Sequence, residues 1–309
     1  MIKLSIIIPV HNAERHLQRL LGSVVRALGN IPGEILAIDN GSTDNSLSLL
    51  KKYQKEYPKI FSVLQCHTKG AAAARNFGAK RARGEYIWFI DADDEVAEAS
   101  ADKLLKKAKE TDADLVMMGA KRIYPNGHTD YLSPVSCDED NYESRFVRYG
   151  MGPWQVIVRR KWWAKHGFSF KEGFIHEDME LMSALILYTD KYAYVDEPLY
   201  LYYQNPESVL HKSKFNSDIF DIFPALRGLH QRFVDKKAEK KYHDELEWFF
   251  IWNLLIDSAK DFGMFPEGKA GFEKSRKMLL EYFPGWRKNR FLKQKPLRLR
   301  IRVRLNYHK

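Results

Sequence analysis

The most informative segment of this chain is Tyr86-Ile87-Trp88-Phe89-Ile90-Asp91-Ala92-Asp93-Asp94. An apolar strand ends here in three carboxylates within four positions, and so much like charge in one place needs a cation. Oxygen ligands at this density suit a hard divalent ion, Mg²⁺ or Mn²⁺, which keeps several waters and completes its shell with the phosphates of a nucleotide. The alternative is an acidic turn whose Asp residues only cap the next helix.

Outward from this run, the first half of the chain alternates strands and helices, the pattern of an α/β fold with a mostly parallel sheet. Ligands of such a sheet bind beyond the carboxyl ends of its strands. Pro9, Asp39 and Asp91 each fall at such an end, so we expect them to converge on one crevice. Strands are predicted over 4–10, 34–38, 61–66, 85–90 and 115–119, and helices over 14–28, 46–57, 71–82 and 101–110.

Asp39 ends the second predicted strand, just before the turn 40–46. Gly41 permits a tight turn, and the Ser, Thr and Asp residues after it can cap the following helix, so the turn has a structural explanation. Asp39 precedes the turn. We therefore expect its carboxylate to accept a hydrogen from a pyrimidine ring nitrogen or a ribose hydroxyl, with a purely local turn role as the alternative.

Composition indicates an ordinary globular chain with an appended segment. Its 309 residues are 45% apolar and 13% aromatic, enough for a sizeable core. The apolar run at the N-terminus is too short for a secretory signal, and no segment reaches the roughly 18 apolar residues of a membrane-spanning helix. Cys66 and Cys137 lack metal-ligand spacing and give no disulfide framework, which favours the cytosol.

The net charge of +10 resides in the C-terminal tail, because residues 285–309 contain ten Lys or Arg and no Asp or Glu. Such a block attracts anionic surfaces, either phospholipid headgroups or nucleic acid. Apolar residues alternate with arginines over 297–305, which predicts an extended strand with one apolar and one cationic face. We expect docking on an anionic membrane surface; a folded edge strand and a solvated tail are the alternatives.

Four blocks of the sequence carry a resemblance to a known family: 5–14 (SIIIPVHNAE), 38–44 (IDNGSTD), 70–78 (GAAAARNFG) and 84–94 (GEYIWFIDADD). In their order and spacing, the chain resembles family 2 glycosyltransferases of the GT-A fold, which act in bacterial polysaccharide and glycolipid assembly. Three residues depart from the family pattern. Asn40 stands where a second Asp is common, His11 where Tyr is common, and Lys69 where the family often has Gly or another residue.

The resemblance implies a site for a nucleotide sugar, with a UDP-sugar as donor and Mn²⁺ or Mg²⁺ as cofactor. Asp39 would contact the base, with Arg75 near the base and that Asp. Asp91 and Asp93 would bind ribose and, through the metal, the diphosphate, while Asp94 would either assist or orient its neighbours. The remaining residues expected to contact the nucleotide sugar are Pro9, Asn12 and Gly70.

The segment Ile175-His176-Glu177-Asp178-Met179-Glu180 precedes an apolar run, so Asp178 is expected at the first turn of a helix. Helix-start chemistry alone favours acidic residues there. The resemblance implies instead that Asp178 is the base that removes the acceptor hydroxyl proton, with Glu177 as the alternative base.

A late His completes the metal shell in many GT-A enzymes, and His211 matches it by order. His176 is the rival for this role, Lys212 would contact a phosphate, and an ordinary surface His is the remaining interpretation.

We therefore predict a metal-dependent inverting glycosyltransferase with a glycan or lipid-linked acceptor, peripheral on the inner face of the plasma membrane. Two alternatives stay open: a catalytically silent nucleotide-sugar-binding partner subunit, and a nucleic-acid-binding protein using the basic tail. A neutral body without a nucleic-acid motif disfavours the latter, so no nucleic acid is expected. The predicted parts are a catalytic domain over 1–212, with a nucleotide-sugar half 1–120 and an acceptor half 121–212, a helical extension over 213–284 and the tail 285–309.

Overall fold

The structure is a computed structural model that describes residues 1–134, 142–204 and 215–309. Its internal contacts divide the chain into two compact units. Unit 1 comprises Met1–Ser136, Gly152–Gly173 and Thr189–Ser208, and unit 2 comprises Cys137–Met151, Phe174–Tyr188 and Val209–Lys309. No helix in the described ranges combines the length and apolar character needed to cross a bilayer.

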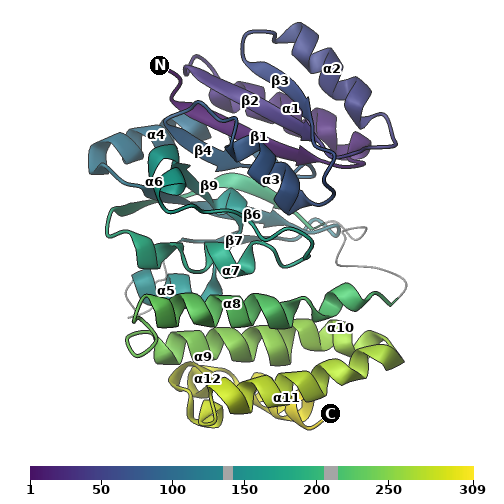
Figure 1. Cartoon of the computed structure of the whole chain (residues 1–309), viewed down its shortest axis with the longest axis vertical. Coiled ribbons are helices and arrows are strands. Elements are labelled where there is room, and N and C mark those ends of the chain that lie inside the picture. The colour runs from purple at the N-terminus through teal and green to yellow at the C-terminus, as the bar shows by residue number, and fades with distance from the viewer. Residues whose placement is uncertain (135–141, 205–214) are drawn as a thin grey trace. The chain divides into compact units, whose positions relative to one another are not determined.

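Unit 1 is an α/β structure with helices against its sheet, as predicted (Figure 1). The sheet has nine strands among the described residues, in the order β3-β2-β1-β4-β8-β6-β9-β5, with β7 paired to β6. Strands β3, β2, β1 and β4 are mutually parallel, as are β6 and β9, whereas β8 is antiparallel to both of its neighbours. The strands are β1 Leu4–Val10, β2 Gly33–Asp39, β3 Phe61–Gln65, β4 Tyr86–Phe89, β5 Glu95–Val96, β6 Leu115–Ile123, β7 Thr129–Leu132, β8 Val156–Arg159 and β9 Tyr192–Tyr203.

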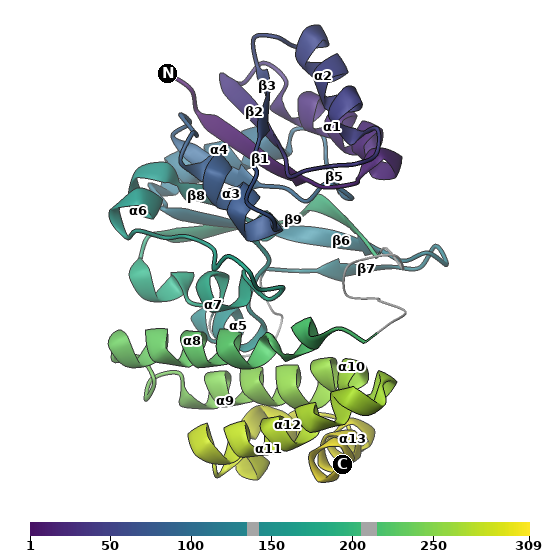
Figure 2. The same cartoon turned by 45° about the vertical axis from the view of Figure 1, so that its right-hand side comes forward.

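Successive side chains of β1 point to opposite faces of the sheet, and helices pack against both faces (Figure 2). Ile6 and Ile8 belong to one core cluster together with buried residues of α1 and α4. Ile7 points to the opposite face, where α3 packs so closely that a Cβ at Gly78 would lie 2.5 Å from the Ile7 side chain. The helices of unit 1 are α1 Glu14–Leu28, α2 Ser46–Glu56, α3 Ala71–Ala79, α4 Ser100–Thr111 and α6 Arg160–Lys165.

The predicted elements of the first half agree with the structure. Strand 4–10 and helix 14–28 have the predicted bounds, and most of the others differ by one to three residues at an end. The largest difference is β6, which continues to Ile123 instead of ending at 119 because it pairs with both β7 and β9 over its second half.

The described part of unit 2 is helical, and its helices lie in layers in both views (Figures 1 and 2). The helices predicted within 215–284 are present. Helix α9 continues into α10 through a π-helical turn, Asn253–Asp257. The helices are α5 Tyr142–Tyr149, α7 Met179–Met182, α8 Ile222–Asp235, α9 His243–Trp252, α10 Ser258–Met264, α11 Ala270–Tyr282, α12 Arg290–Gln294 and α13 Leu297–His308.

The compact units do not follow the predicted boundaries at 212 and 284. Two earlier segments of the chain belong to unit 2, since α5 and α7 pack against helices that come later in the sequence. Glu180 of α7 pairs with Arg232 of α8 at 3.0 Å. Ser144 of α5 donates a hydrogen bond to Glu245 of α9 at 2.7 Å. The tail 285–309 is likewise a folded part of unit 2.

The prediction of an extended strand over 297–305 is wrong, because this segment is the helix α13. The described part of unit 2 contains no strand with which it could pair. Packing against unit 2 stabilises the helix instead. Val303, Asn306 and Tyr307 are buried, and the Asn306 side-chain amide donates to the Leu255 carbonyl at 2.9 Å. Tertiary contacts of this kind override a local pattern.

Candidate functional site

The structure places the predicted strand-end residues at one edge of the sheet in unit 1. Val10 pairs with Asp39, and Ile7 pairs with Phe89, two residues before Asp91. Because β1 lies between β2 and β4, the tips that carry Asp39 and Asp91 are two strand spacings apart, about 10 Å. Asp39 is only 2% exposed, and the Ser42 backbone amide donates to its Oδ1 at 3.3 Å.

Asn12 joins the tip of β1 to the turn that follows β2. It adopts a left-handed backbone conformation with φ of 49°, which Asn tolerates better than most residues. Its Oδ1 accepts a hydrogen bond from the Thr43 backbone amide at 2.7 Å, and the backbone amide of Asn12 donates to the Ser42 hydroxyl at 3.2 Å. Asn12 thus fixes the turn around Asp39.

The structure explains why Asn40 replaces the Asp that is common in the family. Its side-chain amide donates to the carbonyls of Cys66 and Thr68 at 3.0 and 2.7 Å. Its Oδ1 accepts from the Gly70 amide at 2.8 Å, where Gly70 has a φ of 111°. A carboxylate has no hydrogen to donate to two carbonyls. Asn40 therefore ties the tip of β2 to the turn before α3.

Arg75 is a buried member of the site and not a cation on the helix surface. Its side chain is 6% exposed and donates to Asp91 Oδ1 at 2.7 Å, with Asp91 28% exposed. The resemblance implied a position near Asp39, and the structure shows the pair with Asp91. An ion pair of this geometry fixes the Asp91 carboxylate in one orientation.

Asp94 points into the protein. It is fully buried, and its two oxygens accept hydrogen bonds from the Tyr200 hydroxyl at 2.7 Å and the Tyr203 amide at 2.8 Å. Burial, and then the charges of Asp91 and Asp93, raise the pKa of Asp94 to about 8. The Tyr200 hydroxyl also accepts from the Asp91 amide at 3.2 Å. These contacts favour a role for Asp94 in orienting its neighbours.

Arg19 of α1 holds the other side of the acidic turn 91–94. Its guanidinium donates to the Asp93 carbonyl oxygen at 2.6 Å, pairs with Glu95 at 2.9 Å and lies 3.6 Å from the centre of the Tyr203 ring. Burial and the neighbouring Asp91 raise the pKa of Asp93. The turn thus brings together two half-buried carboxylates whose mutual repulsion a cation would relieve.

Asp91 and Asp93 fit the donor set of Mg²⁺ or Mn²⁺. Among the described residues, no further His, Cys, Asp or Glu joins them in a group of three ligand atoms within 4.8 Å of one another. Two carboxylates are what such an ion uses when substrate phosphates and waters complete its shell. His211, the predicted additional ligand, and Lys212 lie outside the described residues.

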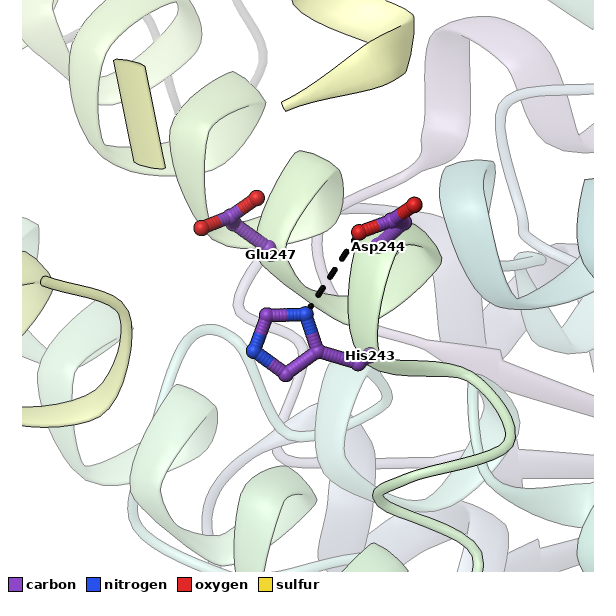
Figure 3. A group of neighbouring side chains, drawn as sticks. All are labelled: His243, Asp244 and Glu247. Carbon is purple, nitrogen blue, oxygen red and sulfur yellow. Dashed lines mark hydrogen bonds and ion pairs between the residues drawn. The ribbon is translucent and has the colours of Figure 1, made fainter. Parts of the chain in front are cut away.

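A different group, His243, Asp244 and Glu247 of α9, does bring three ligand atoms within 4.8 Å (Figure 3). Its charges already have partners in unit 2. Arg290 pairs with Asp244 at 3.1 Å, and the Asn289 side-chain amide donates to Glu247 at 2.7 Å. We therefore interpret this group as part of the packing between α9 and α12.

The predicted base, Asp178, lies in unit 2 together with Glu177. Asp178 directly precedes α7, as predicted, and its carbonyl accepts from the amides of Leu181 and Met182. Its side chain makes no capping hydrogen bond to the helix, although the position is the one where an Asp would cap. Both Glu177 and Asp178 are half-buried. Capping alone does not explain the acidic pair.

His176 beside this pair is half-buried among carboxylates. Burial lowers its pKa, against the opposing effect of Glu177, Asp221 and Asp257, so the imidazole is neutral at physiological pH. The Asp221 carboxylate accepts from the Ile175 amide at 3.1 Å and fixes the segment before the pair.

Two residues that hold the acidic turn, Arg19 and Tyr200, were not predicted from the sequence. Alternation along β9 places Tyr200 and Tyr202 on one face, where both stack on Trp154. That alternation is a usable signal for Tyr200. Nothing in the sequence around Arg19 distinguishes it from the other cations of α1.

Comparison with known proteins identifies the family. The model of the family "Glycosyl transferase family 2" matches residues 5–169, more than half of the chain. "Uncharacterized glycosyltransferase YibD" of Escherichia coli K12 is 29% identical over 269 residues, which span 80% of this chain and 76% of the relative.

Solved structures share the fold. TarS of S. aureus, residues 1–349 in complex with UDP-GlcNAc, superposes with a TM-score of 0.77 at 20% identity, covering 99% of this chain and 89% of that chain. The mannosyltransferase PcManGT of Pyrobaculum calidifontis, in complex with GDP-Man and Mn²⁺, gives a TM-score of 0.55 at 14% identity over 99% of this chain and 87% of that chain. With its acidic turn at the carboxyl edge of a GT-A-like sheet, the chain belongs to glycosyltransferase family 2.

Proposed function

We propose that the chain is an inverting glycosyltransferase that moves a sugar from a UDP-sugar to a hydroxyl of a glycan or lipid-linked acceptor, assisted by Mn²⁺ or Mg²⁺. The observation that carries the proposal is the placement of Asp39, Asp91 and Asp93 at one edge of the sheet, inside the region that the family model matches. The complex of TarS with UDP-GlcNAc supports a uridine nucleotide as donor.

Asp39 and the turn around it are suited to the nucleoside part of the donor. Its carboxylate is nearly buried, and the hydrogen bonds of Asn12 and Asn40 fix the backbone on both sides of it. A carboxylate held in this way accepts a hydrogen from the uracil ring nitrogen or a ribose hydroxyl without further ordering. Pro9 and Gly70 would line the same edge.

Asp91 and Asp93 are suited to the diphosphate part. Arg75 orients Asp91, and Arg19 holds the backbone of Asp93. A divalent cation bound by these two carboxylates would offset the negative charge that develops on the departing nucleotide diphosphate. We propose that the buried Asp94 positions this pair through its hydrogen bonds with Tyr200 and Tyr203 of β9.

Inversion at the anomeric carbon in a single displacement requires a base on the acceptor side. We assign this role to Asp178, with Glu177 as the alternative. Asp178 is half-buried and does not cap α7, so its carboxylate is not committed to the helix start. The neutral His176 beside it adds no positive charge that would stabilise the carboxylate and weaken it as a base.

The acceptor is proposed to lie at the cytoplasmic face of the plasma membrane, where the basic tail would meet anionic headgroups. The ten cations of residues 285–309, without any acidic residue between them, support this location.

The proposal is tested by measuring nucleotide release from a panel of UDP-, GDP- and dTDP-sugars with Mn²⁺, with Mg²⁺ and with a chelator. We expect at least one UDP-sugar to be hydrolysed slowly, in a reaction that the chelator stops. The Asp93→Ala variant serves as the inactive control. Turnover that is equal with and without the chelator would refute the metal role. If no nucleotide sugar is bound or hydrolysed, the proposed sugar transfer is refuted.

A further inference from the structure

We infer that the outer face of α13 is a docking surface for an anionic lipid bilayer, lying flat in the headgroup region with an apolar stripe of Leu297, Ile301 and Leu305 toward the acyl chains. The inference deepens the proposed location of the acceptor. It differs from the expectation of an extended tail, because the contact is made by one face of a folded helix.

The inner face of α13 is anchored in unit 2, so the helix exists before any membrane is met. Val303 is fully buried, and Tyr307 packs on Trp286 with ring centres 5.0 Å apart. Arg276 of α11 donates to the Tyr307 carbonyl at 3.1 Å. Together with the hydrogen bond from Asn306 to Leu255, these contacts fix which side of α13 faces outward.

The outer face carries three large apolar side chains at a spacing of four residues. Leu297, Ile301 and Leu305 are 65%, 48% and 61% exposed. Successive members of such a series are displaced by about 40° around a helix, so the three form one continuous stripe. Exposed aliphatic side chains aligned in this way on a folded surface indicate a binding site.

Arginines border the stripe on both sides. Arg298 and Arg302 follow it on one side of the helix, and Arg300 and Arg304 lie on the other. None of the four has a carboxylate of the described residues within salt-bridge distance. An apolar stripe between two rows of unneutralised cations offers an anionic bilayer an apolar contact and an electrostatic contact on the same face.

The chemistry of this face favours lipid over other occupants. A second copy of the same face would bring four arginines against four arginines, which costs free energy unless acidic residues intervene, and residues 285–309 contain none. Nucleic acid would engage the arginines but leave the aliphatic stripe in water. An anionic bilayer satisfies both, because its phosphates meet the arginines and its acyl region takes up the stripe.

The inference is tested by sedimentation of the full chain with vesicles of phosphatidylcholine alone and of phosphatidylcholine mixed with phosphatidylglycerol. We expect binding to the mixed vesicles. The triple variant Leu297→Ser, Ile301→Ser and Leu305→Ser should weaken this binding by at least about tenfold, since it removes the apolar contribution and leaves the charge unchanged. The pair Arg298→Gln and Arg302→Gln should also weaken it, by about tenfold at low salt.

Matched controls separate the surface from general effects. Met264→Ser removes an exposed apolar side chain elsewhere in unit 2, and Lys51→Gln with Lys52→Gln removes the same net charge from α2; both should bind as the wild type does. Should the triple variant fold poorly by circular dichroism, Ile301→Ser alone is the second variant, with an expected loss of about threefold.

Wild-type binding by the triple variant, or a wild-type dimer that this variant dissociates, would overturn the inference. So would retention of a DNA duplex in the absence of vesicle binding. Vesicle binding requires no nucleotide sugar, so it fails or succeeds independently of the proposed function. A chain that transfers sugar but stays in the supernatant contradicts the docking surface and the proposed membrane location, and leaves the proposed sugar transfer intact. One that binds vesicles without turning over any donor contradicts only the enzymatic proposal.

Discussion

The acidic turn 91–94 of unit 1 and the segment 176–178 of unit 2 contain the same kind of side chain in different surroundings. In the turn, Arg75, Arg19 and Tyr200 hold the carboxylates and the backbone between them, and burial with mutual repulsion raises the pKa of Asp93. In the segment, Asp178 stands before a short helix that it does not cap, next to a neutral His176. Rigid, crowded carboxylates suit cation binding, whereas a half-buried carboxylate near a neutral imidazole suits proton transfer.

The largest expected effect comes from Asp178→Asn, which tests the proton-transfer half of this comparison. The amide keeps the shape of the side chain but cannot take a proton, so kcat for transfer should fall by about a thousandfold while the KM for donor changes little. Steady-state kinetics with a competent acceptor provide the measurement. Glu177→Gln is the matched control and should retain most activity. A reversed outcome, with Glu177→Gln inactive and Asp178→Asn active, would move the base to Glu177.

Asp93→Ala tests the cation-binding half. Loss of one of two proposed ligands should reduce metal-dependent donor turnover by about a thousandfold, because several kcal/mol of charge stabilisation depend on the ion. A Mn²⁺ titration of the hydrolysis rate measures it. Asp102→Ala, in the first turn of α4, is a control that removes a carboxylate outside the turn. Saturable Mn²⁺ activation that survives in Asp93→Ala would show that Asp93 is not a ligand of the ion.

Tyr200→Phe tests whether the hydroxyl of Tyr200 on β9 stabilises the acidic turn 91–94. The change removes the hydroxyl that accepts from the Asp91 amide and donates to Asp94, and it leaves a buried carboxyl with one partner fewer. The free energy of unfolding should fall by about 1–3 kcal/mol. Denaturant unfolding provides the value. Tyr53→Phe is the control, because the exposed Tyr53 hydroxyl makes only a long hydrogen bond of 3.4 Å to the Gln18 carbonyl. This variant should change the free energy of unfolding by less than about 0.5 kcal/mol.

Arg19→Ala, for which we expect the weakest effect, tests whether Arg19 positions Asp93. Without the contacts to the Asp93 carbonyl and Glu95, the turn should sample more conformations, and the Kd for donor with Mn²⁺ should rise about tenfold. Arg26→Ala, at an exposed residue in the last turn of the same helix, is the control. If both variants bind donor equally well, Arg19 has no positioning role.

Local sequence signals predicted most of unit 1 and the placement of its carboxylates. Strand alternation and turn residues fixed where β1, β2 and β4 end, and parallel pairing then brought Asp39 and Asp91 to one edge. The orientation of Asp94 was beyond such reasoning. It depends on β5 pairing with β9, where Val96 meets Tyr200 more than a hundred residues later in the chain.

In the tail 285–309, by contrast, local sequence signals predicted the wrong secondary structure. Its alternating pattern is a valid signal for a strand, yet a strand needs a partner, and α13 forms because unit 2 offers helices and the Leu255 carbonyl as contacts. The roles of Asn40 and Arg75 were also beyond local reasoning, since Asn40 contacts the turn before α3 and Arg75 of α3 contacts the turn after β4, both far away in the sequence.

The division of labour between the two acidic regions is tested most directly by calorimetric titration of the best UDP-sugar into the wild type, Asp93→Ala and Asp178→Asn in the presence of Mn²⁺. We predict that Asp178→Asn binds the donor with the affinity of the wild type and that Asp93→Ala shows no metal-dependent binding. Equal loss of donor binding in both variants, or undiminished donor binding by Asp93→Ala, would show that the two acidic regions do not have these separate roles.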